Sequence, residues 1–165
     1  MDGTMCKVKF CVASEAQLPQ ILSLYRSVIG KEGCTWDMFY PSEGTLKEDF
    51  AAKQLYVLQM GDLLIGAGSI VPENELDDLG LWQACGNAKE LARIVIAPAW
   101  QGKGYGKLLV QRLCDQLSHH KCAAVHILVA KENHPAQQMY RQLGFRNKGD
   151  CQRYGLDFFA YEKMV

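Results

Sequence analysis

The amino-acid sequence predicts a domain of mixed α/β or α+β class. Short apolar segments typical of strands alternate with longer segments whose apolar residues have helical spacing. Two apolar segments are separated only by Gly61 and Asp62, which indicates an antiparallel hairpin and therefore a sheet that is not purely parallel. The 165 residues contain no repeats or low-complexity segments and fit a single domain covering residues 1–165.

The N-terminal half predicts a strand, two helices and the hairpin. Ser14 followed by Gln17 is a capping-box pattern in front of the first helix, and Thr45 followed by Glu48 predicts the start of the second. The aromatic segment between the two helices ends at Pro41, which favours a turn. The expected elements are a strand at 7–13, helices at 18–30 and 45–53, and strands at 55–60 and 63–71.

The C-terminal half predicts an alternation of strands and helices. A strand ends at Pro98, and the helix that follows a glycine-rich loop is expected to begin near Lys107. Asn133 and Gly144 mark the expected start and end of the last helix. The remaining strands are expected at 90–98, 124–130 and 156–165.

Composition argues against several classes of protein. Lys plus Arg and Asp plus Glu number 18 each, so the net charge does not favour nucleic-acid or membrane binding. The longest apolar runs are far shorter than the roughly 20 residues that span a bilayer. The seven cysteines and four histidines lack the short spacings of zinc ligands, so no metal is expected. An odd number of scattered cysteines without an apolar leader favours a reducing, cytoplasmic setting.

A glycine-rich loop, QGKGYGK, extends from Gln101 to Lys107. It fails the Walker pattern because Gln101, not glycine, stands five residues before Gly106, and it fails the dinucleotide pattern because Lys107 stands where the third glycine belongs. Glycines at a helix N-terminus nevertheless direct N–H groups at one anion, and a pyrophosphate would fit. A tight turn without a ligand is the alternative interpretation.

A second motif supports a ligand-binding loop. Residues 133–145 have the sequence NHPAQQMYRQLGF. Together the two segments resemble the motifs [RQ]-x-x-G-x-[GA] and N-x-x-A-x-x-x-Y-x-x-x-G-F of the GCN5-related N-acetyltransferase (GNAT) family. The resemblance extends from about Glu90 to Phe145, and the expected elements before it are compatible with that family. It implies a GNAT fold, with a mixed, mostly antiparallel sheet of six to seven strands flanked by about four helices.

The resemblance implies that acetyl-CoA is the co-substrate. Backbone N–H groups of the loop would hold its pyrophosphate, and the fourth strand would pair with the pantetheine arm and polarise the thioester carbonyl. Asn133 would contact the pantetheine or cap its helix. The implied CoA-binding residues are Ile94, Val95, Ile96, Gln101, Gly102, Lys103, Gly104, Tyr105, Gly106, Lys107 and Asn133.

Two residues are expected to be catalytic. The resemblance implies that Tyr140 donates a proton to the leaving thiolate. An alkyl amine, with a pKa near ~10.4, must also lose a proton before it attacks a thioester. Glu90 is the candidate base, because the segment from Glu90 to Gly106 is as long as in histone-acetylating family members. A water chain, another carboxylate, or a merely solvated Glu90 are the alternatives; a cysteine nucleophile is not expected, because Cys114 lies in the middle of a helix.

The acceptor is expected to be a primary amine of a small molecule, reached by direct transfer. The candidate pocket residues are Trp36, Phe39, Tyr40 and Trp82, with packing in a satellite core as the alternative. A protein or peptide N-acetyltransferase and a non-catalytic acyl-CoA-binding module are the alternative functions. The acceptor's identity and the acyl chain length stay open. So does homodimer formation, for which the strand at 156–165 is either an interface strand or an ordinary edge.

Overall fold

The computed structural model describes residues 7–72, 76, 79–84, 87–119 and 121–165. Its strands are β1 (Val8–Val12), β2 (Leu55–Met60), β3 (Leu63–Pro72), β4 (Ala88–Ile96), β5 (Ala124–Ala130), β6 (Arg146–Arg153) and β7 (Leu156–Met164). Its helices are α1 (Leu18–Ser27), α2 (Glu43–Ala51), α3 (Tyr105–Ser118) and α4 (His134–Gln142), with short 3-10 turns at Glu15–Gln17 and Pro98–Trp100. Of the seven cysteines, Cys6 and Cys85 lie outside the described residues.

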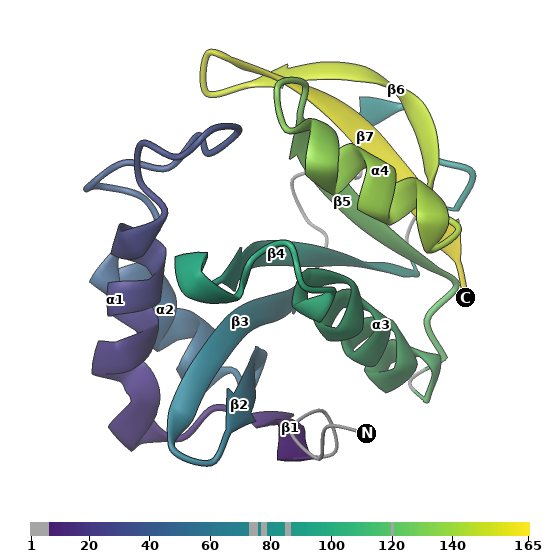
Figure 1. The fold of residues 1–165 in the computed structure, drawn as a ribbon. Helices are drawn as coiled ribbons and strands as arrows, with labels where there is room; N and C mark the ends of the chain where they lie inside the picture. Colours follow the sequence, from purple (N-terminus) through teal and green to yellow (C-terminus); the bar gives the residue numbers. More distant parts are fainter. Residues whose placement is uncertain (1–6, 73–75, 77–78, 85–86, 120) are drawn as a thin grey trace.

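The strands form one seven-stranded sheet in the order β1-β2-β3-β4-β5-β7-β6. Every neighbouring pair is antiparallel except β4 and β5, which are parallel (Figure 1). The parallel pair joins an N-terminal half, β1 to β4, to a C-terminal half, β5 to β7. The structure thus confirms the predicted class and the mixed, mostly antiparallel sheet.

Helices cover the sheet on both faces. One apolar cluster packs α3 and α4 against the sheet and includes Leu109, Leu113, Ile127, Tyr140 and Phe145. A second cluster packs α1 and α2 against the opposite face of the N-terminal half, through residues such as Ile21, Leu46 and Val57. A third, small cluster covers that same face of the C-terminal half with the segment that holds Leu76, Leu79, Leu81 and Trp82.

The start of α2 corrects one expectation. The capping box at Thr45 and Glu48 is wrong, because the helix begins at Glu43 with Ser42 as its N-cap. The Ser42 hydroxyl accepts a hydrogen bond of 3.0 Å from the backbone N–H of Thr45, so Thr45 lies inside the first turn. The capping pair before α1 is present, since Gln17 Oε1 accepts from the N–H of Ser14 at 2.9 Å.

The C-terminal hairpin was only partly predicted. The sequence analysis named no strand at Arg146–Arg153, where the structure places β6, a mostly polar edge strand. Its partner β7 pairs with β5 on one side and β6 on the other. The expectation that this last strand is an ordinary edge is therefore wrong, because β7 lies inside the sheet, and a role in a dimer interface stays a prediction.

Candidate active site

The site is built around the opening between β4 and β5. The two strands pair only where Ala88–Glu90 meets Ala124–His126, although both continue further. Beyond these residues the strands run apart (Figure 1). Within the described residues, the edge of β4 that faces β5 is left without a paired strand after Glu90. An extended ligand can pair with such an edge as an additional strand.

A bulge shapes this part of β4. The β3–β4 register shifts between Ala67 and Ser69, and Arg93 opposite them has a φ of 54°, in the left-handed region that a residue with a side chain seldom adopts. β3 approaches the bulged strand closely: a Cβ added to Gly66 would lie 2.6 Å from the carbonyl oxygen of Val95. Only glycine fits at that position without displacing β4.

The predicted pantetheine-binding strand presents N–H groups to the opening. Ala97 donates its N–H to Ile65 of β3 at 2.8 Å. Because successive N–H groups of a strand point to opposite edges, those of Ile96 and Ile94 point away from β3, toward the open side. The Val95 side chain is buried in the cluster that packs α1 against the sheet, so Val95 contributes a packing contact on that face of the sheet.

The glycine-rich loop has the conformation expected of an anion-binding turn. Gly102 and Gly104 have φ values of 74° and 90°, and Gly104 is the N-cap of α3. The first turn of a helix leaves N–H groups without intrahelical partners and carries a partial positive charge. The Gln101 side chain ties the loop to β4 by donating to the carbonyl oxygen of Ile96 at 2.9 Å.

Lys103 and Tyr105 of the loop have different surroundings. The Lys103 ammonium lies 5.4 Å from the centre of the Trp100 ring, close to the loop. Tyr105 is buried and meets Trp100 edge to face, so its side chain anchors the start of α3 in the core. The helix begins at Tyr105, two residues before the predicted Lys107.

A cavity of about 530 Å³ lies between α3 and α4. Lys107, Arg112 and Lys163 contribute cationic side chains to it, and Asp115 contributes an anionic one. Cys114 also lines it; burial raises the pKa of its thiol to about 11, so the thiol stays protonated at neutral pH. That protonation disfavours the cysteine-nucleophile mechanism.

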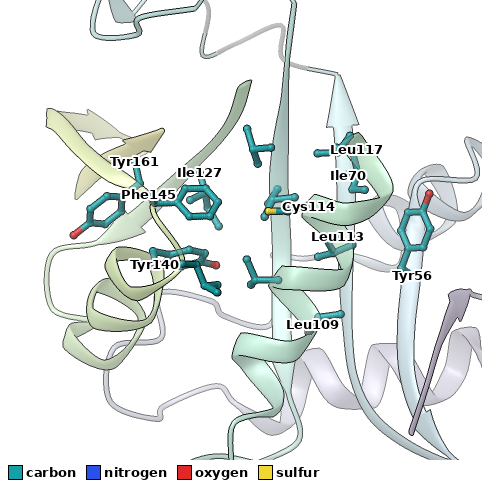
Figure 2. Packing of buried hydrophobic residues seen from close by; sticks show 14 of the residues in the cluster. Tyr56, Ile70, Leu109, Leu113, Cys114, Leu117, Ile127, Tyr140, Phe145 and Tyr161 are labelled. Carbon is teal, nitrogen blue, oxygen red and sulfur yellow. The ribbon is translucent and has the colours of Figure 1, made fainter. Parts of the chain in front are cut away.

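Tyr140 lies on the α4 side of the opening. Its ring is buried beside Phe145 and Tyr161, and its hydroxyl points from α4 toward the part of α3 that carries Cys114 (Figure 2). Burial raises the pKa of this hydroxyl, to which the nearby Cys114 adds. The group is therefore a proton donor at neutral pH, as the predicted role requires.

Asn133 is the N-cap of α4. Its Oδ1 accepts from the N–H of Ala136 at 3.2 Å. A Cβ added to Gly33 would lie 3.0 Å from Cγ of Asn133, so the loop between α1 and α2 packs directly on this residue. The capping role expected for Asn133 is confirmed, and contact with a pantetheine stays a prediction.

Glu90 lies on the face opposite to Tyr140. It is the last residue of β4 in register with β5, and it is half-buried. Its neighbour Leu91 belongs to the apolar cluster under α3 and α4. Because side chains alternate along a strand, Glu90 projects from the face that carries α1 and α2.

Three of the four predicted acceptor residues lie in the loop between α1 and α2. Trp36 is half-buried, edge to face with Tyr25 at 5.5 Å. Phe39 is 85% exposed, which leaves its ring available to a ligand. The N–H groups of Phe39 and Tyr40 both donate to Asp37 Oδ1, at 2.8 and 2.9 Å, which fixes the loop.

Trp82 lies elsewhere, on the C-terminal half of the sheet. Its ring stacks on His126 with centroids 3.7 Å apart, and its Nε1 donates to the carbonyl oxygen of Leu76 at 2.8 Å. The ring is 8% exposed. These contacts favour the satellite-core interpretation of Trp82 over the acceptor pocket.

A buried ionic network at the bulge was missed by the sequence analysis. Arg93 donates to both carboxylate oxygens of Asp49 in α2, at 2.6 and 2.9 Å, and its third nitrogen donates to the Tyr40 hydroxyl at 3.0 Å. Ser69 of β3 donates to the same carboxylate at 2.7 Å. The network joins α2, β3, the β4 bulge and the loop before α2. The sequence offers one sign of this network, because Arg93 is a charged residue within the otherwise apolar segment LARIVIA.

The part of the chain that the structure describes has neither a cluster of metal ligands nor a membrane-spanning helix. Within the described ranges, no three or more His, Cys, Asp or Glu side chains gather as metal ligands. No helix among the same residues has the length and apolar character that crossing a membrane requires. The described cysteines Cys11, Cys34, Cys114, Cys122 and Cys151 are all free.

Comparison with known proteins gives matches to acetyltransferases. The spermine/spermidine N(1)-acetyltransferase of Bacillus subtilis (strain 168) is 32% identical over 76 residues, which are 46% of this chain and 47% of that protein. The mycothiol acetyltransferase of Thermobifida fusca (strain YX) is 39% identical over 56 residues, 34% of this chain and 17% of that protein. The chain thus spans about half, or less, of the length of these curated relatives.

Solved structures share the whole fold. The ribosomal-protein-alanine N-acetyltransferase of Brucella melitensis superposes with a TM-score of 0.77 at 19% identity, over 95% of this chain and 99% of that chain. The Salmonella typhimurium protein yncA, solved with its cofactor acetyl-CoA, gives 0.77 at 17% identity, over 95% and 93%. The profile of the Acetyltransferase (GNAT) family matches residues 19–145. This chain therefore belongs to the GNAT family of acetyltransferases.

Proposed function

We propose that this protein is an N-acetyltransferase that moves acetyl directly from acetyl-CoA to a primary amine of a small molecule. One observation carries the proposal: Tyr140 and Glu90 flank the opening between β4 and β5 from opposite faces of the sheet. A thioester held in the opening would have a proton donor on one side and a carboxylate on the other. In a direct transfer the two groups would act on the same bound thioester.

Each group has one task in the proposed reaction. The Glu90 carboxylate takes a proton from the amine, which frees the nitrogen electron pair to bond to the thioester carbonyl carbon. The N–H groups of β4 that face the opening stabilise the negative charge that develops on the carbonyl oxygen. The carbon–sulfur bond then breaks, and Tyr140 gives its hydroxyl proton to the sulfur. The new amide nitrogen releases its surplus proton to solvent, Glu90 releases the proton that it took, and Tyr140 regains a proton from solvent, which closes the cycle.

The chain offers a matching site for CoA. The positive-φ glycines and the first turn of α3 suit a pyrophosphate, and the cationic side chains of Lys107, Arg112 and Lys163 between α3 and α4 suit further phosphate. The free edge of β4 suits the amide groups of a pantetheine arm. Asn133 caps the start of α4, after β5.

The acceptor side supports a small amine. Trp36, Phe39 and Tyr40 share the loop that packs on Asn133, on the face to which Glu90 projects. The similarity to a spermine/spermidine acetyltransferase makes polyamines the first acceptors to test. Peptide amines are the second, since a ribosomal-protein acetyltransferase shares the fold.

Activity is tested by release of free CoA from acetyl-CoA with a panel of polyamines, other small amines and peptides with free N-termini. We expect turnover with a small amine, a kcat lowered by roughly 100-fold or more in Glu90→Gln that partly recovers at high pH, and a similar loss in Tyr140→Phe. Full activity of Glu90→Gln eliminates the base role. Tight CoA binding without thioester cleavage for any amine would instead identify a non-catalytic acyl-CoA-binding module.

A further inference from the structure

Three ionisable side chains lie in one row across the C-terminal part of the sheet. Glu90 of β4 is in register with His126 of β5, and His126 is in register with Glu162 of β7. Residues in register on neighbouring strands share a face and lie roughly 5 Å apart. Since β5 lies between β4 and β7, His126 lies between two residues that carry carboxyl groups, one on each neighbouring strand.

The outer carboxyl group of the row is fixed and ionised. Glu162 is 4% exposed, and its two oxygens accept from the backbone N–H groups of Gln83 and Ala84 at 2.9 and 3.0 Å. Burial opposes ionisation, but the N–H groups of Ala84 and Gln83 and the imidazole of His126 outweigh it and lower the pKa of this carboxyl. An ionised carboxylate can only accept hydrogen bonds, so Glu162 accepts a hydrogen bond from the His126 imidazole.

Two contacts with the histidine ring are described. It is fully buried, and its Nε2 lies 2.8 Å from Oε2 of Glu162. Trp82 stacks flat on the ring, with an interplanar angle of 10°. An ionised carboxylate and an indole face both favour the imidazolium, against the cost of burial.

Among the described residues, the other charges near this row lie mainly on the side of Glu162. The covering segment brings Trp82 and no charged side chain among its described residues 76 and 79–84. Arg146 of β6 is in register with Glu162 on its far side, and Lys148 and Lys163 line a cavity of about 400 Å³ that reaches Glu162. These cations lie beyond Glu162. On β4 itself, Arg93 lies three residues after Glu90 and is paired with Asp49, and His126 is the cationic residue in register with Glu90 on the neighbouring strand.

We propose that His126, kept protonated by Glu162 and Trp82, is a positioning residue that holds the Glu90 carboxylate ionised, ready to accept a proton from the amine. The inference rests on the proposed function, because it acts through the proposed base. A positive charge within about 4–6 Å lowers the pKa of a carboxyl group by roughly one to three units. Without it, Glu90 would be protonated, and inactive as a base, at higher pH.

The pH profile of kcat/KM tests this role. On the acid side of the profile, kcat/KM rises with pH as Glu90 loses its proton; this rise is the acid limb. In His126→Gln the acid limb should move to higher pH by roughly one to three units. In Glu162→Gln it should move in the same direction, because His126 then loses its anionic partner. His119→Gln, at an exposed histidine at the end of α3, is the matched control and should leave the limb in place. A merely structural role would lower the melting temperature without moving the limb.

A second measurement does not depend on turnover or on folding of the variants. In the wild-type protein, nitrogen-15 NMR should show both imidazole nitrogens of His126 protonated at pH 7. A neutral His126 overturns the inference whatever the activity. Loss of activity in Glu90→Gln together with an unmoved acid limb in His126→Gln overturns the inference and leaves the proposed base intact.

Discussion

Among the described residues, each half of the sheet buries an ion pair on the same face, one on either side of the opening between β4 and β5. In the N-terminal half, Arg93 contacts Asp49 at 2.6 Å; in the C-terminal half, His126 contacts Glu162 at 2.8 Å. The distances are alike, but the cations differ. Arginine stays charged at every pH at which proteins fold, whereas histidine titrates near neutrality.

That difference separates a geometric role from a chemical one. The planar guanidinium of Arg93 fixes two oxygens of Asp49 and the hydroxyl of Tyr40, so it can hold the β4 bulge and the loop before α2 in place. The guanidinium keeps all its protons at every pH at which proteins fold. Histidine, unlike arginine, can gain or lose its charge at pH values where proteins fold, so the charge of His126 depends on its partners Glu162 and Trp82, whereas that of Arg93 does not.

The largest effect is expected from breaking the first pair. Asp49→Ala leaves the Arg93 guanidinium, whose side chain is 11% exposed, without its carboxylate, and should lower the free energy of unfolding by about 3–5 kcal/mol. Urea unfolding measures this change. Because the bulge carries the N–H groups that face the opening, the KM for acetyl-CoA should also rise.

The control is the exposed pair of Glu43 and Lys47, 2.9 Å apart on the same helix. Glu43→Ala should change the unfolding free energy by less than about 1 kcal/mol. A similar small change in Asp49→Ala would contradict the view that the buried pair holds the bulge.

The second prediction concerns pH and the other pair. The pKa of Glu162 is lowered in the folded protein, so its ionisation contributes stability that is complete above the unfolded-state pKa near ~4.3 and is lost as pH falls through the folded pKa. Glu162→Gln should therefore lower the unfolding free energy by roughly 1–3 kcal/mol at pH 7. The difference in unfolding free energy between Glu162→Gln and the wild type should be smaller at pH 3. Urea unfolding at both values checks this, and a gap that widens in acid would refute the assignment.

Several features of the site were predictable because local rules govern them. The glycines of the loop and the cap at Asn133 follow from backbone conformation, which depends on a few neighbouring residues. The pairing of Arg93 with Asp49 joins residues 44 positions apart, and the row of Glu90, His126 and Glu162 depends on strand order. Spacing along a chain contains no information on register between strands. β6 was missed because its solvent-exposed polar residues lack an apolar alternation.

The smallest effect tests the corrected start of α2, the helix that carries Asp49. Ser42→Ala removes the acceptor of the Thr45 N–H and should cost about 1 kcal/mol. Thr45→Ala keeps that N–H and its acceptor, so it should change stability by less than about 0.5 kcal/mol. Urea unfolding of both variants separates the two possible caps. Because α2 packs on the N-terminal half alone, Ser42→Ala should leave the nitrogen-15 signals of His126 unchanged, whereas a shifted imidazole would show that the two ion pairs are coupled across the opening.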